Sequence, residues 1–176
     1  MKLLVIGGSN SKNSINRQLA QFAASLFEQA IIQVVDISQI DLPLFSVDKE
    51  SENGIPDAAQ TFANAIDHSD FIVLSLAENN GSYNVGFKNL MDWTSRIKNR
   101  KTWGDKPMLL LSTSPGKLGG ANVLASAKNY FPYMGADIKA AFSLPSFYQN
   151  FDTQKGITDV ESLQNLKNIV ENLKNN

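Results

Sequence analysis

Residues 2–16 read KLLVIGGSNSKNSIN, and this stretch decides the fold. The run KLLVI at its start is typical of a β-strand that is buried on both faces of a sheet. Residues 14–29, which follow a turn of glycines and small polar residues, carry apolar side chains at three- and four-residue spacings and predict an amphipathic helix. A buried strand that leads through such a turn into a helix indicates an α/β fold with a parallel sheet.

The rest of the chain repeats this alternation of strand and helix. Further apolar runs of strand length lie at 31–37, 70–76, 108–112 and 138–144. Further helical patterns lie at 56–68, 86–97, 121–134 and 159–173. Strand–helix–strand units have right-handed connections, so helices cover both faces of the sheet. We therefore predict one domain over residues 1–176, with a five-stranded parallel sheet in the order 2-1-3-4-5 and irregular segments at 41–55 and 145–158.

The composition excludes several classes of function. The chain has 16 Lys and Arg against 17 Asp and Glu, which gives a net charge of −1, so we expect no nucleic-acid partner. It has no cysteine and a single histidine, which excludes a thiolate nucleophile and a cysteine- or histidine-rich metal site. The first apolar run is shorter than that of a signal peptide, and no run reaches the length of a membrane span. We expect a cytoplasmic protein with no membrane partner and no bound metal.

The glycines gather in three loops, each of which follows a predicted strand. Seven of the eleven glycines lie there, namely Gly7, Gly8, Gly81, Gly86, Gly116, Gly119 and Gly120. In a doubly wound sheet the carboxyl ends of these strands lie side by side, around the point where the strand order reverses. Glycine lets a ligand approach the backbone, although tight turns use it as well. Three such loops together predict a ligand crevice.

The first of these loops, GGSNSKNSIN at residues 7–16, has the composition of a phosphate site. It enters a helix, whose free amides and dipole favour an anion. It also carries short polar side chains and nearby cations, namely Ser9, Ser11, Ser14, Asn16, Lys12 and Arg17. These residues suit a terminal phosphate monoester, and they match neither the Walker pattern nor G-x-G-x-x-G. Alternatively, they supply only the N-cap of the helix, from Ser14 or Asn13.

The other two loops predict contacts with a flat heterocycle. They read AENNGSYNVGFKNLMDW at residues 77–93 and STSPGKLGGAN at residues 112–122. Their amides and carbonyls could bind the polar edge of a ring system. Tyr83, Trp93 and Trp103 are candidate stacking surfaces, although aromatic residues at such spacings are also typical of core packing.

In these three loops the sequence resembles the NADPH-dependent FMN reductase family, a flavodoxin-like group that includes quinone and azo-dye reductases. GSNSKNSIN resembles the family's phosphate loop GS-x-R-x-x-S-x-N. The second loop resembles P-E-Y-N-x-S followed by L-K-N-x-x-D-W, and SPGKLGG at residues 114–120 resembles S-x-G-x-x-G-G. The resemblance covers nearly the whole chain. It implies a single flavodoxin-like domain that binds FMN, with NADPH or NADH as reductant.

The resemblance also implies which residues bind the cofactor. Those on the phosphate loop are Ser9, Ser11, Ser14, Ile15 and Asn16, of which Ser9, Ser14 and Asn16 would hold the phosphate. Those at the isoalloxazine ring are Glu78, Asn79, Asn80, Gly81, Ser82, Ser114, Pro115, Gly116, Gly119 and Gly120. Ser11 stands where the family often has an arginine, which removes a cation that Lys12 or Arg17 could replace.

The function implied by the resemblance is that of an FMN-dependent NAD(P)H oxidoreductase. Hydride would pass from NAD(P)H to flavin N5 and then to a small-molecule acceptor such as free flavin, a quinone or an azo compound, in ping-pong order and without a catalytic side chain. The alternative is a non-enzymatic electron carrier like flavodoxin. A hydrolase that uses Ser9 would need His68 nearby, but we interpret His68 as a helix-end residue.

Related proteins commonly form dimers or tetramers, so we expect a homodimer or homotetramer. The third predicted helix offers a candidate contact surface, made by Phe87, Leu90, Met91 and Trp93.

Overall fold

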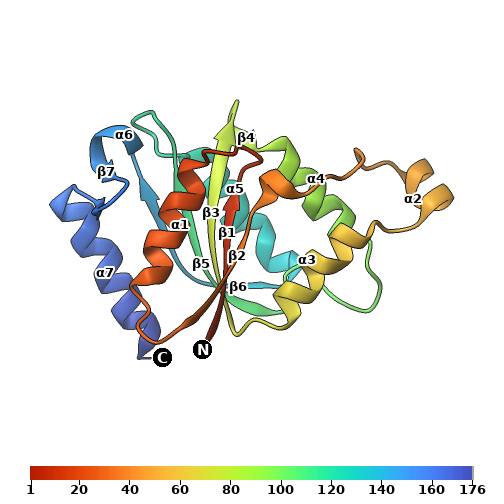
Figure 1. Ribbon diagram of the computed structural model, residues 1–176, viewed down its shortest axis with the longest axis horizontal. Coiled ribbons are helices and arrows are strands. Elements are labelled where there is room, and N and C mark those ends of the chain that lie inside the picture. The colour runs from red at the N-terminus through yellow and green to blue at the C-terminus, as the bar shows by residue number, and fades with distance from the viewer. Residues whose placement is uncertain (176) are drawn as a thin grey trace.

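The computed structural model describes residues 1–175, and its centre is a parallel sheet with helices on both faces (Figure 1). Five long strands stand in the order β2-β1-β3-β5-β6. Their bounds are Lys2–Gly8 for β1, Ile31–Val35 for β2, Phe71–Asn79 for β3, Lys106–Thr113 for β5 and Ala136–Leu144 for β6. The predicted fold class and the order of these five strands are confirmed. The sheet differs from the prediction in one detail, because β4 (Ser82–Tyr83) adds a short antiparallel strand beside β3.

The long helices follow the predicted periodic segments. They are α1 (Ile15–Ser25), α3 (Asp57–Asp67), α4 (Val85–Thr94), α5 (Ala121–Tyr130) and α7 (Val160–Lys174). The predicted fourth helix is shorter than expected, because Pro132 lies in a separate 3-10 turn, η2 (Phe131–Met134).

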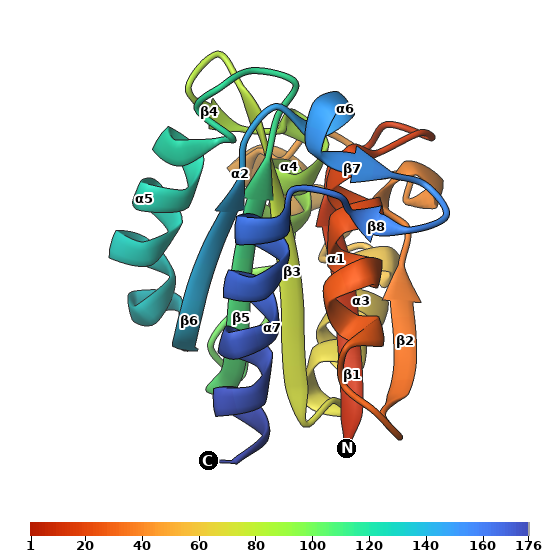
Figure 2. The same cartoon turned by 90° about the vertical axis from the view of Figure 1, so that its left-hand side faces the viewer.

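The alternation of side chains along β1 divides the core into two layers. Leu4 and Ile6 point to the face that is covered by α3, α4 and α5. Leu3 and Val5 point to the opposite face, which is covered by α1 and α7, the two helices in front of the sheet in Figure 2. All four residues are almost fully buried, as predicted for a strand with helices on both sides.

Both segments that were expected to be irregular contain short elements. Segment 41–55 holds α2 (Val47–Asn53), whose N-cap Ser46 accepts a hydrogen bond from the amide of Lys49. Segment 145–158 holds α6 (Phe147–Asn150) and a hairpin of β7 (Phe151–Asp152) and β8 (Gly156–Ile157), and a 3-10 turn, η1 (Ile37–Gln39), follows β2. These elements are too short to show a periodic pattern in the sequence.

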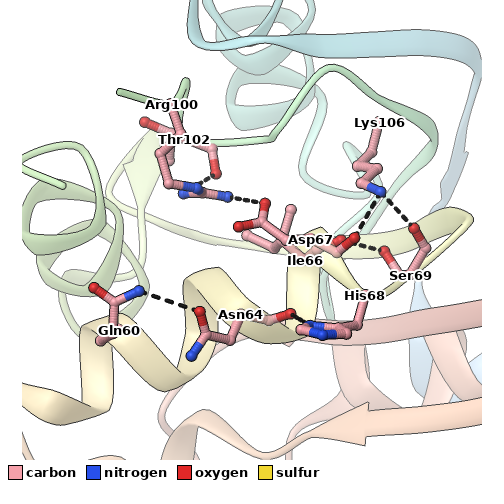
Figure 3. A network of polar contacts seen from close by, with 9 residues as sticks. All are labelled: Gln60, Asn64, Ile66, Asp67, His68, Ser69, Arg100, Thr102 and Lys106. Atoms are coloured by element: carbon pink, nitrogen blue, oxygen red, sulfur yellow. Dashed lines mark hydrogen bonds and ion pairs between the residues drawn. The ribbon is translucent and has the colours of Figure 1, made fainter. Parts of the chain in front are cut away.

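A polar network closes the carboxyl end of α3 at the amino edge of the sheet (Figure 3). The Lys106 ammonium donates to the carbonyl oxygens of Asp67, at 2.9 Å, and Ser69, at 2.7 Å. A cation at this end of a helix complements the helix dipole. His68 ends the helix, and its Nδ1 lies 2.7 Å from the carbonyl oxygen of Asn64. The interpretation of His68 as a helix-end residue is confirmed.

Within residues 1–175 we find no helix whose length and apolar character would let it cross a membrane.

Candidate active site

A cavity of about 190 Å³ lies at the carboxyl ends of β1, β3 and β5, where the sequence predicts a ligand crevice. Of the predicted residues, those that line it are Ser9, Ser11, Ser14, Ile15, Asn16, Glu78, Asn79, Ser114 and Pro115. It is also lined by four residues that were not predicted as site residues, namely Asn13, Ala77, Thr113 and Tyr148. The fold thus brings the first loop together with the start of the second and third.

Two buried hydroxyl groups on the first loop are ready to donate hydrogen bonds into the cavity. Ser14 is the N-cap of α1, and its Oγ accepts a hydrogen bond from the amide of Arg17 at 3.1 Å. Ser9 Oγ accepts one from the amide of Ser11 at 3.2 Å. Within residues 1–175 neither hydroxyl donates, so each keeps its proton for a ligand. Two such donors beside the N-terminus of a helix favour an anion.

Arg17, one of the two cations near this loop, is already paired. Its Nη1 lies 2.5 Å from Asp36 Oδ2, and its Nη2 donates to the carbonyl oxygen of Lys12 at 2.6 Å. Desolvation raises the pKa of Asp36, but the hydrogen bonds from Ser38 and the charge of Arg17 together lower it by more. The pKa therefore lies below its ordinary value. The guanidinium therefore ties the first loop to the segment after β2.

Asn16 is buried and makes three hydrogen bonds to residues of two strands. Its Oδ1 accepts from Ser75 Oγ at 2.7 Å and from the amide of Thr113 at 3.0 Å. Its Nδ2 donates to the carbonyl oxygen of Thr113 at 3.1 Å. Asn16 therefore joins the start of α1 to β3 and β5.

Glu78 closes the N-terminus of α5. Its Oε2 accepts from the amide of Val123 at 3.0 Å, and its Oε1 accepts from Asn122 Nδ2 at 3.1 Å. Gly120 is the N-cap of this helix and provides no side-chain hydrogen bond, so the carboxylate supplies the missing acceptor. Glu78 thus links the end of β3 to the start of α5.

The second loop is a tight hairpin. Asn80 and Gly81 both have positive φ, at 52° and 76°, between the paired residues Asn79 and Ser82. This is the geometry of a type I′ turn, for which Asn-Gly is the favoured pair. As a result Asn80, Gly81 and Ser82 lie exposed at the turn and do not line the cavity.

Two asparagines that the sequence analysis did not single out as site residues hold the hairpin against the first loop. Asn84 Nδ2 donates to Asn10 Oδ1 and to Asn79 Oδ1, each at 3.1 Å. Asn84 Oδ1 also caps α4 by accepting from the amides of Gly86 and Phe87. The one available signal was that Asn84 stands just before the helical pattern at 86–97, as is typical of an N-cap.

The glycines of the third loop do not belong to the lining of the cavity. The carbonyl oxygen of Gly119 accepts from Ser112 Oγ at 2.8 Å and from Ser143 Oγ at 2.9 Å. Gly119 and Gly120 are buried, Gly116 is exposed, and none of the three lines the cavity. Their place at the ring of a bound flavin stays a prediction.

The candidate stacking residues belong mainly to the core. Trp93 and Trp103 are almost completely buried. Tyr83 stacks on Phe131 with ring centroids 5.8 Å apart, and burial raises the pKa of Tyr83 to about 12.

The prediction of a subunit contact surface on α4 is wrong. Phe87, Leu90, Met91 and Trp93 are all buried against this chain's own sheet and loops. The apolar pattern that identified them belongs to the inner face of the helix.

Comparison with known proteins identifies the family. Residues 1–149 match the model of the family described as NADPH-dependent FMN reductase. The chain belongs to this family. It is therefore an NAD(P)H-dependent oxidoreductase that works with a flavin and a nicotinamide reductant.

Several relatives of this FMN reductase family member have named activities. A 2-hydroxy-1,4-benzoquinone reductase of a Burkholderia species is 33% identical over 135 residues, which cover 76% of this chain and 72% of the relative. An NADPH:quinone oxidoreductase of Arabidopsis thaliana is 28% identical over 181 residues, which cover 98% and 90%. Among solved structures, FerB, a flavoenzyme NAD(P)H:(acceptor) oxidoreductase of Paracoccus denitrificans, is 27% identical with a TM-score of 0.76, over 97% of this chain and 93% of FerB.

The geometry also rejects the hydrolase alternative for this reductase family member. Ser9 follows the carboxyl end of β1, whereas His68 precedes the amino end of β3. These strands run parallel, so the two residues lie at opposite edges of the sheet, about 20 Å apart at ~3.3 Å per strand residue. A serine–histidine pair cannot form across that distance.

Proposed function

We propose that this chain is an FMN-dependent NAD(P)H:quinone oxidoreductase. The observation that carries the proposal is the pair of buried hydroxyls of Ser9 and Ser14, which have protons to donate and stand at the N-terminus of α1. A terminal phosphate monoester suits such a site because it accepts several hydrogen bonds from neutral donors. This favours FMN, which ends in a phosphate, over FAD, in which the corresponding phosphate is part of a diphosphate.

The residues of the crevice act by binding and orienting the cofactor. Ser9, Ser11 and Ser14 would donate to the phosphate together with the first amides of α1. The hairpin after β3 and the loop after β5 would border the isoalloxazine ring, through Asn79 and Ser114 among others. The bound flavin supplies the redox chemistry, which is acceptance of a hydride from the nicotinamide and its transfer to the acceptor.

Glu78 has a supporting part in this proposal. Its carboxylate already accepts two hydrogen bonds at the start of α5, so it holds the second loop in place.

The names of the relatives point to quinones as the class of electron acceptor. Both the Burkholderia and the Arabidopsis relatives are named for quinone substrates. We infer the same class here, with NADPH as reductant as in the family's description. Free flavin and azo compounds are the further acceptors to compare with quinones.

We also propose that the whole chain is one domain, that it works in the cytoplasm, and that it forms a homodimer. A groove of about 310 Å³ beside α4 and η2 supports self-association. The side chains of Tyr130 and Tyr133 are 61% and 82% exposed at the groove, and Tyr83 Oη is buried there without a partner among the described residues. The charged residues at the groove are already paired within the chain, Lys88 with Asp92 and Lys101 with Asp105, so the exposed tyrosines carry the proposal.

The proposed activity is tested by steady-state kinetics of the FMN-loaded protein. We expect NADPH oxidation that depends on an added quinone, with parallel lines in double-reciprocal plots because the two substrates bind in turn. NADPH oxidation that proceeds equally well without an added acceptor would contradict the proposal. Intersecting lines in the double-reciprocal plots would contradict it as well.

A further inference from the structure

The carboxamide of Asn16 differs from the serine hydroxyls of the same loop because its hydrogen bonds are directed into the protein. The residue is 2% exposed, and its oxygen already accepts two hydrogen bonds, from Ser75 and Thr113. Its nitrogen donates to Thr113. A carboxamide offers two acceptor sites and two donors, so at most one N–H remains. Turning the amide toward a phosphate would leave buried groups of β3 and β5 without partners.

The contact with Thr113 has the form of a backbone pairing. Asn16 accepts from the amide and donates to the carbonyl of this one residue, as a peptide group of a neighbouring strand would. Thr113 is the last residue of β5, and its register partner on β3 is Ala77. The carboxamide thus stands where the two strands end and the crevice begins.

The bonds continue beyond Asn16 across the sheet. Thr113 Oγ1 donates to the carbonyl oxygen of Leu144, the last residue of β6, at 2.7 Å. On the other side, Ser75 lies within β3 and pairs in register with Gly7 on β1. One continuous set of hydrogen bonds therefore connects the ends of β5 and β6 and the middle of β3 to the first turn of α1.

We propose that Asn16 is a positioning residue that sets the separation of the first and third loops, and that it does not contact the cofactor phosphate. The inference rests on the proposed FMN site. Ser9, Ser11 and Ser14 and the amides of α1 then bind the phosphate, while Asn16 fixes the shape of the crevice for the whole flavin.

The test compares FMN with riboflavin, which lacks the phosphate. Wild type, Asn16→Ala and Ser9→Ala are each titrated with both ligands, and flavin fluorescence reports binding. If Asn16 acts by positioning, Asn16→Ala weakens both ligands by the same factor, about tenfold for lost buried hydrogen bonds. Ser9→Ala, the comparison variant on the same loop, weakens FMN and spares riboflavin.

A second readout is the visible circular dichroism of the flavin at saturating FMN. This signal depends on the shape of the crevice around the ring, so Asn16→Ala changes it and Ser9→Ala does not. A loss confined to FMN together with an unchanged spectrum in Asn16→Ala would overturn the inference and assign Asn16 to the phosphate. Unchanged affinity for both ligands would overturn it as well.

Ser75→Ala keeps the inference testable if Asn16→Ala does not fold. Ser75 is fully buried within β3 and makes one of the three hydrogen bonds to Asn16. Its removal should weaken FMN and riboflavin equally, by a smaller factor, and equal affinities to wild type would contradict the inference. A wild type that binds neither flavin would instead contradict the proposed function.

Discussion

Two carboxylates, Glu78 in the crevice and Asp36 near it, make hydrogen bonds or ion pairs that hold the loops together. Glu78 accepts at the start of α5, and Asp36 accepts from Ser38 and pairs with Arg17. Both neutralise groups that would otherwise lack partners beside the site. The residues with protons free to donate, Ser9 and Ser14, are neutral. At the scale of residues, the crevice therefore offers neutral hydrogen-bond donors beside carboxylates that are already paired.

Replacement of Glu78 tests its role as the cap of α5. We expect Glu78→Ala to lower the free energy of unfolding of the cofactor-free protein by about 1 kcal/mol, because an N-terminal amide loses its charged acceptor. Urea denaturation followed by circular dichroism measures the change. Glu28→Ala, at an exposed position, is the matched control. Equal stability of the two variants would rule out the capping role.

The ion pair of Asp36 predicts a dependence of stability on pH. Because the pKa of Asp36 in the folded chain lies below its ordinary value of 3.8, the pair stabilises the fold above that pH. The stabilisation disappears as the pH falls through the lowered pKa. Asp36→Asn should cost up to about 1 kcal/mol at neutral pH, as for partly exposed pairs, and progressively less below the ordinary pKa. Urea denaturation across this pH range checks the prediction, and a cost that grows on acidification would refute it.

At the scale of elements, apolar patterns in the sequence predict the five long strands and the long helices, because the helices and the central strands β1, β3 and β5 each bury an apolar face. The edge strand β2 is largely exposed and was predicted only from its run of apolar residues. The shorter elements depend on contacts between distant segments. The segment before α2, for example, is held where Trp93 Nε1 and Asn89 Nδ2 donate to the carbonyl oxygen of Pro43, at 2.7 and 3.0 Å. No local pattern could reveal such contacts.

The site was predicted at the level of loops but not of every residue. Glycines after strands located the crevice, and the hydroxyls of the first loop do line it. The hairpin was missed although Asn80-Gly81 is a strong turn signal, since the glycines of the three loops together were interpreted as room for a ligand rather than as tight turns. Tyr148 had no signal at all, because α6 brings it to the cavity through the tertiary fold.

Gly86 marks the contact between α4 and the first loop. A Cβ at this position would lie 2.8 Å from Asn10 Cβ, closer than packed side chains allow. We expect Gly86→Ala to lower the free energy of unfolding by about 1–3 kcal/mol through overpacking, despite the better helix propensity of alanine. Gly116→Ala is the control, since its nearest neighbour would be Ser114 Oγ at 3.9 Å. A Gly86→Ala variant that is at least as stable as wild type in urea would contradict this contact.

At the scale of the whole molecule, the fold places the crevice and the groove proposed for self-association on different parts of the surface. The crevice lies at the carboxyl edge of the sheet, and the groove lies beside α4 and η2 on one helical face. The N-terminus and the carboxyl end of α7 lie at the opposite, amino edge (Figure 1). A partner on the groove can therefore approach without crossing either of these ends.

The groove is tested by removing its most exposed aromatic side chain. Exposed tyrosines commonly dominate the energy of protein interfaces. We expect wild type to run as a dimer at micromolar concentration and Tyr133→Ser to shift it toward monomer, measured by size exclusion with light scattering. Tyr148→Ser is the control, because Tyr148 is similarly exposed but lies at the crevice. A monomeric wild type, or a Tyr133→Ser variant that stays dimeric, would contradict the proposal that the groove is the dimer contact.

Whether this chain binds FMN and reduces it with NADPH is best tested by an anaerobic NADPH titration of the purified protein, after loading with FMN and removal of free flavin. We expect FMN to stay with the protein and one equivalent of NADPH to bleach its visible absorbance, which a quinone then restores. A protein that emerges colourless and gives no binding heat with FMN, or whose bound FMN stays oxidised in excess NADPH, would contradict this expectation.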